Sequence, residues 1–177
     1  MSSDEYRRLV EAGVFDEDAR VELIEGLLVD MSPKTRAHEN AIAWLNRLLV
    51  TAIDANLFEV RVAAPLTIGA SEPEPDIAVI GRSAPRPNHP ATAELVIEVA
   101  VSSLQRDLHE KPPIYAQADV PDYWVIDLEA RRVVTHSAPD GGRYMQVGVV
   151  GAGGELNAQS VTLPAISVAE LLSAAAH

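Results

Sequence analysis

The chain has no cysteine, which excludes both a disulfide framework and a metal site built from thiolates. It also has no apolar run close to the roughly 18 residues that a membrane-spanning helix needs, and its first residues, Met1 to Arg8, are largely polar. These absences predict a cytoplasmic protein without a membrane partner. Any metal ion would have to bind through oxygen or imidazole ligands.

Positive charge is scarce as well. The chain has 26 aspartates and glutamates but 14 lysines and arginines, of which only Lys34 and Lys111 are lysines, and its formal net charge is −12. Proteins that hold nucleic acid mainly through phosphate contacts carry the opposite balance. The composition argues against strong, non-specific DNA binding. It is compatible with a nuclease, because some acids can be metal ligands and a local basic strip can persist in an acidic protein.

What the sequence does contain is a succession of short apolar segments that fits one domain spanning residues 1–177. Apolar spacing, capping residues and flanking glycines predict helices at 3–12, 35–56, 104–118 and 168–176. Apolar runs predict strands at 58–62, 65–68, 76–80, 94–101, 123–128, 132–137 and 143–149. A further hairpin spans 21–31, with its turn at Glu25-Gly26, and residues 139–142 connect the last two strands. The loop at 81–90, rich in arginine and proline, is predicted to be the most mobile segment.

Two acidic residues interrupt apolar strands. Asp76 opens the run Ile77 to Ile80, and Glu98 lies inside the apolar segment 94–101. An unpaired buried carboxylate costs several kcal/mol, a large part of the stability of a domain. A divalent cation between the two acids would offset their charge and create a hydrolytic centre. The simpler alternatives are that Asp76 accepts hydrogen bonds at the start of its strand and that Glu98 pairs with an arginine.

Other polar residues flank these strands. His38, at the start of the long helix, could complete a metal shell or hold a water, or it could cap the helix. Glu22 and Glu25 lie on one hairpin at an odd spacing, so at most one of them faces a cleft. Lys111 precedes two prolines, so the helix at 104–118 either kinks there or starts at Pro112, and a lysine at a helix end can simply be solvated.

One family pattern runs through nearly the whole chain. Its parts are Glu22-Leu23-Ile24-Glu25-Gly26, Met31-Ser32-Pro33 with His38, Pro75-Asp76, Leu95-Val96-Ile97-Glu98-Val99, Ser102-Ser103 with Asp107 and Lys111, and Tyr115-Ala116 with Val120-Pro121-Asp122-Tyr123-Trp124. The last block is the most specific. In these motifs the chain resembles the Uma family of restriction endonucleases, within the PD-(D/E)xK or restriction-endonuclease-like superfamily.

The resemblance implies a fold and a site. The fold class is α/β (α+β), with a restriction-endonuclease-like core in which a mixed central sheet is flanked by helices, and with additional antiparallel hairpins. The implied catalytic residues are Asp76, Glu98 and Lys111, with Asp76 and Glu98 as metal ligands. The superfamily's lysine normally follows the acid by two positions, where this chain has Ala100. Lys111 would therefore take that role, with Arg106 as its substitute. Further candidates are Glu22, Glu25, His38 and Asp107.

The implied activity is Mg²⁺- or Mn²⁺-dependent hydrolysis of nucleic-acid phosphodiester bonds, with DNA as the partner. The superfamily often pairs two subunits, and we expect the Tyr123-Trp124 pair and the hairpin at 132–149 to be exposed, so a homodimer is predicted. Two rival functions stay open. One is a catalytically degenerate nuclease-like scaffold for binding or assembly, favoured by the acidic charge and the two prolines. The other is a hydrolase of smaller phosphoesters.

Overall fold

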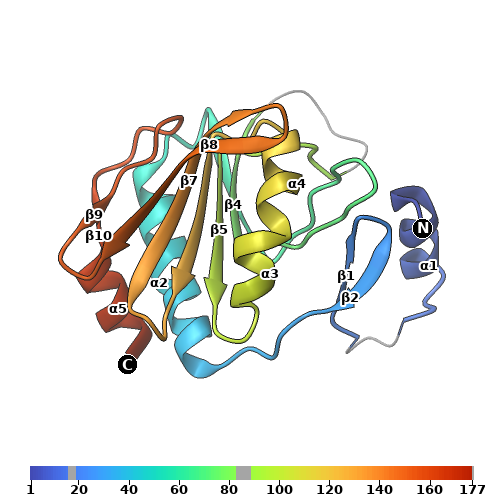
Figure 1. The fold of residues 1–177 in the computed structure, drawn as a ribbon, viewed down its shortest axis with the longest axis horizontal. Coiled ribbons are helices and arrows are strands. Elements are labelled where there is room, and N and C mark those ends of the chain that lie inside the picture. Colours follow the sequence, from blue (N-terminus) through green and yellow to red (C-terminus); the bar gives the residue numbers. More distant parts are fainter. Residues whose placement is uncertain (16–18, 83–88, 177) are drawn as a thin grey trace.

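A mixed sheet of six strands forms the centre of the protein (Figure 1). The computed structural model describes residues 1–15, 19–82 and 89–176. The strands lie in the order β3 (Phe58–Val62), β4 (Ile77–Gly81), β5 (Leu95–Ala100), β6 (Asp122–Asp127), β7 (Arg132–Asp140) and β8 (Arg143–Gly151). β5 and β6 run parallel, and the other neighbours in this sheet are antiparallel. The chain must therefore cross over between β5 and β6.

The crossover consists of two short helices, α3 (Leu104–His109) and α4 (Lys111–Gln117). The sequence predicted one helix over 104–118, but the chain breaks at Glu110 and begins a new helix at Lys111. Pro112 and Pro113 fall in the first turn of α4, where no backbone N–H is needed for a helical hydrogen bond. Of the two predicted arrangements, a helix that starts at the prolines is therefore right to within one residue.

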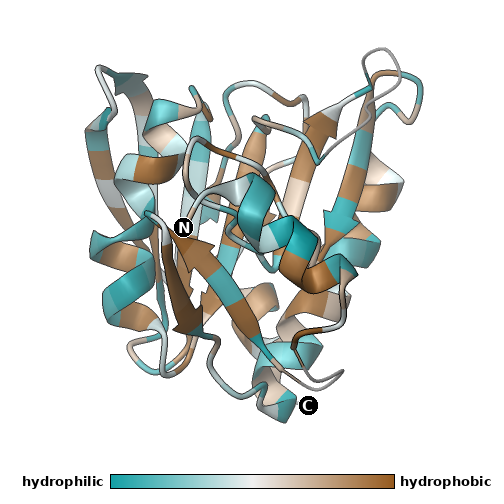
Figure 2. Cartoon of the chain, turned by 90° about the vertical axis from the view of Figure 1, so that its right-hand side faces the viewer, coloured by the Kyte–Doolittle hydropathy of each residue, from teal (hydrophilic) through white to brown (hydrophobic). Residues whose placement is uncertain are grey.

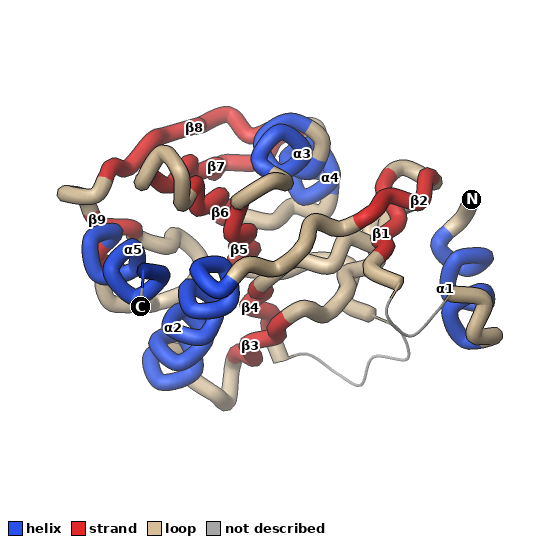
Figure 3. Tube along the Cα trace, turned by 90° about the horizontal axis from the view of Figure 1, so that it is seen from below, coloured by secondary structure: helices blue, strands red, loops and turns tan. Residues whose placement is uncertain are grey.

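Helices cover both faces of the sheet, and Figure 3 shows α2 (Arg36–Ala52) and α5 (Val168–Ala176) on one side of the strands and α3 and α4 on the other. Every residue of β5 and β6 is buried, as expected for strands covered on both faces. Residues that alternate along a strand face opposite layers. Ile97 belongs to the core beneath α2 and α5, whereas Val96 belongs to the core that α4 covers.

The N-terminal segment forms a small unit beside the sheet (Figures 1 and 2). α1 (Ser3–Glu11) is capped by Ser2, and β1 (Val21–Ile24) pairs with β2 (Leu27–Asp30). Glu25 and Gly26 form the turn at positive φ values of 47° and 80°, as in a type I′ hairpin. β1 joins the main body through Leu23, whose backbone exchanges hydrogen bonds of 2.7 and 3.4 Å with Glu72. This junction fixes the position of the neighbouring Glu22.

The predicted strand at 65–68 is wrong. Ile68 makes a single bridge to Ser71, and the segment pairs with no strand in the described part of the chain. Leu66 and Ile68 are nonetheless buried in the core on the α4 side. The apolar residues that suggested a strand are therefore buried, but they anchor a loop.

The last hairpin is tighter than predicted. β7 extends to Asp140 and β8 starts at Arg143, so the connection is Gly141-Gly142, with both glycines at positive φ. The chain then forms two strands of two residues each, β9 (Glu155–Leu156) and β10 (Ile166–Ser167). These strands were not predicted, because two residues are too few to show a periodic pattern.

The predicted exposure of Tyr123 and Trp124 is also wrong. Both side chains are buried. They are neighbours on β6, so alternation sends Trp124 to the core under α2 and α5 and Tyr123 to the core under α4. The two rings are therefore core residues of opposite layers.

Two other expectations concern mobility and membranes. Residues 83–88, most of the loop predicted to be mobile, lie outside the described residues. Within the described ranges, no helix is both long and apolar enough to cross a membrane.

Candidate active site

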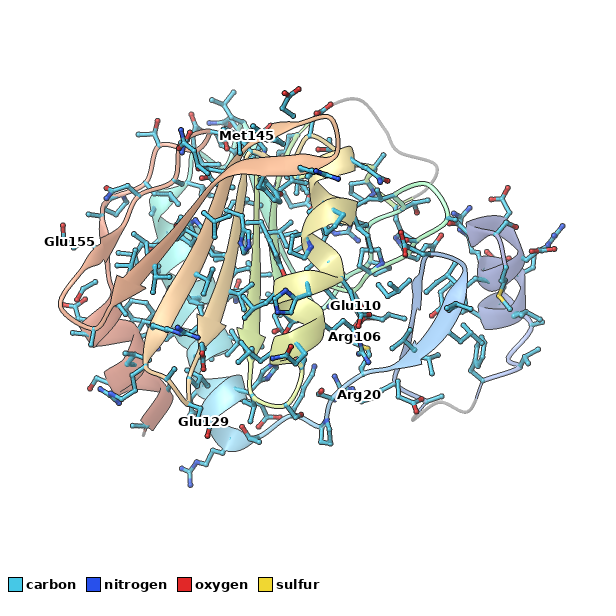
Figure 4. All side chains as sticks on the ribbon, viewed as in Figure 1. Arg20, Arg106, Glu110, Glu129, Met145 and Glu155 are labelled. Atoms are coloured by element: carbon cyan, nitrogen blue, oxygen red, sulfur yellow. The ribbon has the colours of Figure 1, made fainter. Side chains whose placement is uncertain are left out.

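A narrow polar pocket of about 40 Å³ lies between the N-terminal hairpin, the start of α2 and helix α3. Seven of the eight residues singled out from the sequence line it, namely Glu22, His38, Asp76, Glu98, Arg106, Asp107 and Lys111. Glu25 is exposed at the hairpin turn instead. Figure 4 labels Arg20 and Arg106, which lie on the side of the pocket where α3 approaches the hairpin.

Asp76 and Glu98 face each other across β4 and β5. The register of these antiparallel strands pairs Ile77 with Ile97, which sets Asp76 opposite Glu98 one position further along. The backbone N–H of Val99 donates to Asp76 Oδ2 at 2.8 Å, and the N–H of Asp76 donates to Glu98 Oε2 over a long 3.4 Å. The pairing of these two interior strands therefore holds both carboxylates where β4 begins. Asp76 does accept a hydrogen bond at its strand start, as the simpler alternative proposed.

Glu98 is buried, with 4% of its surface exposed. The Lys111 ammonium and the Tyr115 hydroxyl both donate to its Oε1 atom, at 2.9 and 3.0 Å. Burial raises the pKa of Glu98 well above its ordinary value; Lys111 opposes this rise, and the neighbouring acids Asp107, Asp76 and Glu22 add to it. The partner of Glu98 is thus a lysine and a tyrosine, not the arginine of the simpler alternative.

Lys111 is the cationic centre of the pocket. Its Nζ atom lies 3.3 Å from Glu22 and 3.5 Å from Asp107, in addition to its contact with Glu98. Burial alone would lower the pKa of this lysine, but the three carboxylates outweigh burial and raise it, so the ammonium stays charged. With 4% of its surface exposed, Lys111 is not a solvated helix-end charge.

Asp107 supports this centre from α3. Its carboxylate accepts a hydrogen bond from the Ser103 hydroxyl, and its backbone carbonyl accepts one from the Tyr123 hydroxyl at 2.7 Å. Burial raises the pKa of Asp107, while Lys111 and Ser103 lower it in part. Asp107 thus fixes the end of α3 next to Lys111.

His38 lies in the first turn of α2. The side chain of the capping residue Thr35 accepts a hydrogen bond from the His38 backbone N–H at 3.3 Å, which sets the position of this residue. Its Nε2 atom is 3.0 Å from Asp76 Oδ1. Its Nδ1 atom is buried and has no hydrogen-bond partner among the described residues. His38 is therefore more than a helix cap, because its side chain reaches the acids of the pocket.

Glu22 and Arg106 join the hairpin to the crossover helices. The Glu22 carboxylate accepts a hydrogen bond from the backbone N–H of Glu74 at 3.3 Å. Arg106 donates to the carbonyl of Asp30 at 2.9 Å, and its guanidinium lies 3.8 Å from Glu22. These contacts assign Arg106 to the junction with the hairpin, whereas Lys111 contacts Glu98 directly.

The residues of the pocket fit a divalent cation. Five acids line it, Glu22, Glu74, Asp76, Glu98 and Asp107, against three cationic side chains, Arg20, Arg106 and Lys111. Burial raises the pKa of Glu74 as well as those of Glu98 and Asp107. The ionised form of these three carboxyl groups is therefore less favourable in the pocket than in water. Among the described residues, no group of three or more His, Cys, Asp or Glu side chains forms a ready cage for a metal ion. Two facing carboxylates and room for a few waters suit Mg²⁺ or Mn²⁺, since Mg²⁺ keeps several of its waters and takes one or two carboxylates.

Sequence reasoning assigned no role to Tyr115, Ser103 or Glu74. A signal for the first two was present, because Tyr115 follows Lys111 by four residues and Ser103 precedes Asp107 by four, a spacing that puts side chains on one helix face. Glu74 lies in a loop before Pro75, where no periodicity could indicate its direction.

Comparisons with known proteins identify a family and a similar fold. Residues 3–172 match the Uma2 family, whose description is "Putative restriction endonuclease". Among solved structures, the chain is similar to a protein from Anabaena variabilis described as "a putative nuclease belonging to DUF820", with a TM-score of 0.77 and 15% sequence identity over 99% of each chain. We found no relative among curated proteins.

At 15% identity the solved structure shows a shared fold. It confirms the predicted fold class, a mixed central sheet flanked by helices with additional antiparallel hairpins. The family match extends over nearly the whole chain and confirms the resemblance found in the motifs. This protein therefore belongs to the Uma2 family of restriction-endonuclease-like proteins.

Proposed function

We propose that this protein is a Mg²⁺- or Mn²⁺-dependent endonuclease that hydrolyses DNA phosphodiester bonds with Asp76, Glu98 and Lys111. Family membership supports nuclease activity. The observation that carries the finer proposal is the convergence of two facing carboxylates with a charged lysine 2.9 Å from one of them.

The three residues divide two roles between them. Asp76 and Glu98 would hold the cation, with the neighbouring imidazole of His38 as a further candidate ligand. When bound, such a cation polarises a phosphoryl oxygen and lowers the pKa of a coordinated water. Lys111 supplies a fixed positive charge beside the phosphate, where negative charge grows in the transition state. Water adds its oxygen to phosphorus and gives up a proton, the bond to the leaving sugar oxygen breaks, and that oxygen takes up a proton, so that the protons balance overall.

The anchoring of Lys111 supports this role. If Glu98 binds a divalent cation, Glu22 and Asp107 still lie close to the ammonium of Lys111. The lysine is then still paired and still charged. Because it is buried, its position varies little, which is what a contact to a transition state requires.

The surroundings of the pocket support a nucleic-acid substrate despite the net charge of −12. Arg20 and Arg106 line the pocket, and Lys34 is exposed beside Pro33, another lining residue. These three cations would supply the local positive charge that attracts phosphates.

The test is cleavage of plasmid and single-stranded DNA with Mg²⁺ or Mn²⁺, together with melting of the protein with and without Mn²⁺. Mn²⁺ should raise the melting temperature of the wild type, because a ligand of the folded state stabilises it. Asp76→Ala and Glu98→Ala should lose both this rise and cleavage. Glu25→Ala is the matched control, since it removes an exposed acid of the nearby hairpin. Equal Mn²⁺ responses in all four proteins would refute the shared site.

The rival function is a nuclease-like scaffold without catalysis. The engagement of Lys111 by three carboxylates favours it, because these acids compete with phosphate for the ammonium. Under this reading the wild type binds Mn²⁺ but cleaves neither DNA nor RNA. A phosphate monoester in the same assay tests the third function, hydrolysis of a smaller phosphoester.

Of the two surfaces expected to form the proposed homodimer, the hairpin that contains β8 is the one that remains. Tyr123 and Trp124 are buried, but the edge strand β8 exposes Met145, Val147 and Val149 by 66%, 62% and 61%. A long apolar edge strand is a template for pairing with another chain. Light scattering should give twice 19.0 kDa. A monomer at high protein concentration would refute this assembly.

A further inference from the structure

Two residues of α4 bind the same oxygen of Glu98. Lys111 and Tyr115 lie four residues apart, on one face of the helix. The ammonium and the hydroxyl both donate to Glu98 Oε1, at 2.9 and 3.0 Å. The Lys111 ammonium balances the charge of Glu98, but the neutral Tyr115 hydroxyl does not. The hydroxyl at the same oxygen therefore needs a separate explanation.

The other oxygen of Glu98 is left almost free. In the described part of the chain, Oε2 receives only the long 3.4 Å contact from the backbone N–H of Asp76. Two short, charge-assisted donors on Oε1 fix the torsion of the carboxylate. They also occupy that oxygen. The remaining acceptor, Oε2, points to Asp76 and to the pocket.

We propose that Tyr115 is a positioning residue, which locks Glu98 through Oε1 so that Oε2 is presented to the divalent cation. This inference rests on the proposed function of the pocket. Without the hydroxyl, Lys111 alone would hold the carboxylate, and rotation would let the ammonium bridge both oxygens. The cation would then compete with Lys111 for Oε2.

The ring of Tyr115 is held independently of its hydroxyl. The side chain is fully buried, and its ring packs on the Tyr123 ring with centroids 4.8 Å apart. Burial, together with the charge of Glu98, raises the pKa of Tyr115, so the phenol remains a donor. Tyr115→Phe therefore removes one hydrogen bond and keeps the ring packing.

Tyr123 offers a matched control. It is equally buried in the same cluster, but its hydroxyl donates to the backbone carbonyl of Asp107 at 2.7 Å and not to Glu98. Tyr123→Phe thus loses a buried hydrogen bond but removes no donor to the Glu98 carboxylate. Both variants should melt at similar temperatures, because a merely structural role would affect them alike.

The experiment is Mn²⁺ titration by calorimetry of the wild type, Tyr115→Phe and Tyr123→Phe, followed by cleavage at increasing Mn²⁺ concentration. We expect Tyr115→Phe to weaken Mn²⁺ binding by roughly 10-fold or more, the scale for a residue that orients a metal ligand. The Mn²⁺ concentration for half-maximal cleavage should rise by the same factor. Tyr123→Phe should leave both within about twofold of the wild type.

The outcomes separate this inference from the proposed function. If the wild type binds Mn²⁺ and Tyr115→Phe binds it equally well, or if Tyr123→Phe weakens it as much, Tyr115 has no positioning role. If the wild type binds no Mn²⁺, the proposed function itself fails, and the inference with it. The binding measurement is decisive even for a protein that does not cleave DNA.

Discussion

The two faces of the central sheet bury different kinds of side chains. The apolar face, under α2 and α5, is packed with residues such as Leu45 and Ile97. The ionic face, under α3 and α4, buries Glu98 and Lys111 beside a smaller apolar core. One strand serves both, since Ile97 and Glu98 are neighbours on β5.

The two faces should differ in how stability responds to the loss of one side chain. Apolar burial has no direction and scales with the area removed from water, so removing one apolar side chain costs stability in proportion to the area it buries. A buried ionic cluster depends on every partner, because one deletion leaves the other charges unpaired. The ionic face should therefore react more strongly to substitution, and its reaction should depend on pH.

The largest expected effect is that of Lys111→Ala. The substitution leaves Glu98, Glu22 and Asp107 buried without their cation, and breaking a buried ion pair in this way costs about 3–5 kcal/mol. Denaturant unfolding at pH 8 measures the loss. Lys34→Ala, which removes the other lysine from an exposed position, should change the free energy of unfolding by less than about 0.5 kcal/mol.

The same variant carries a pH signature. Burial raises the pKa values of Glu98 and Asp107 in the folded state, so the folded protein prefers these groups protonated once the lysine is gone. The unfolded state then binds fewer protons than the folded one, and stability falls as pH rises above the ordinary carboxyl value of 4.5. The deficit of Lys111→Ala should thus be larger at pH 8 than at pH 5. An equal deficit at both pH values would contradict the ionic account.

A substitution on the apolar face should cost no more free energy of unfolding than Lys111→Ala, and this cost should not depend on pH. Leu45 is fully buried between α2 and the sheet. Leu45→Ala removes apolar contacts and leaves a cavity, at a cost of about 2–5 kcal/mol. Denaturant unfolding at pH 5 and pH 8 should give the same loss, because no titratable group changes its environment. A loss confined to one pH would place ionic coupling on this face as well.

Seven of the residues singled out in the sequence line one pocket, but their contacts were not foreseeable. Acids inside apolar strands indicated Asp76 and Glu98, because polar residues at such places need partners. The register that sets them opposite each other is a property of strand pairing, which periodicity does not reveal. The direction of Lys111 depended on where a helix breaks, and two prolines allowed two solutions.

The errors on the strands have a common cause. Leu66 and Ile68 are buried because they anchor a loop, and a short apolar run alone does not distinguish an anchored loop from a strand. Tyr123 and Trp124 were expected to need an external partner. The crossover helix α4, just before β6, covers Tyr123, and α2 and α5, which are distant in the sequence, cover Trp124; only the tertiary fold shows this.

The smallest expected effect concerns His136, a titratable residue of the ionic face away from Lys111. It is buried on β7 with its ring 5.2 Å from that of Tyr123, and its Nδ1 atom has no hydrogen-bond partner among the described residues. Burial lowers the pKa of His136 below the ordinary value of 6.5, against a weaker opposing effect of a hydrogen bond with the backbone of Tyr123. The unfolded state therefore takes up this proton first, and stability contributed by neutral His136 is lost as pH falls below about 6.5.

His136→Phe keeps an aromatic ring in the cluster and removes the titration. Between pH 7.5 and pH 5.5, roughly one unit on each side of the ordinary histidine pKa, the melting temperature of the wild type should fall more than that of His136→Phe. Parallel pH profiles of the two proteins would show that His136 titrates alike in the folded and unfolded states, and the pH sensitivity of this face would then belong to the Lys111 cluster alone.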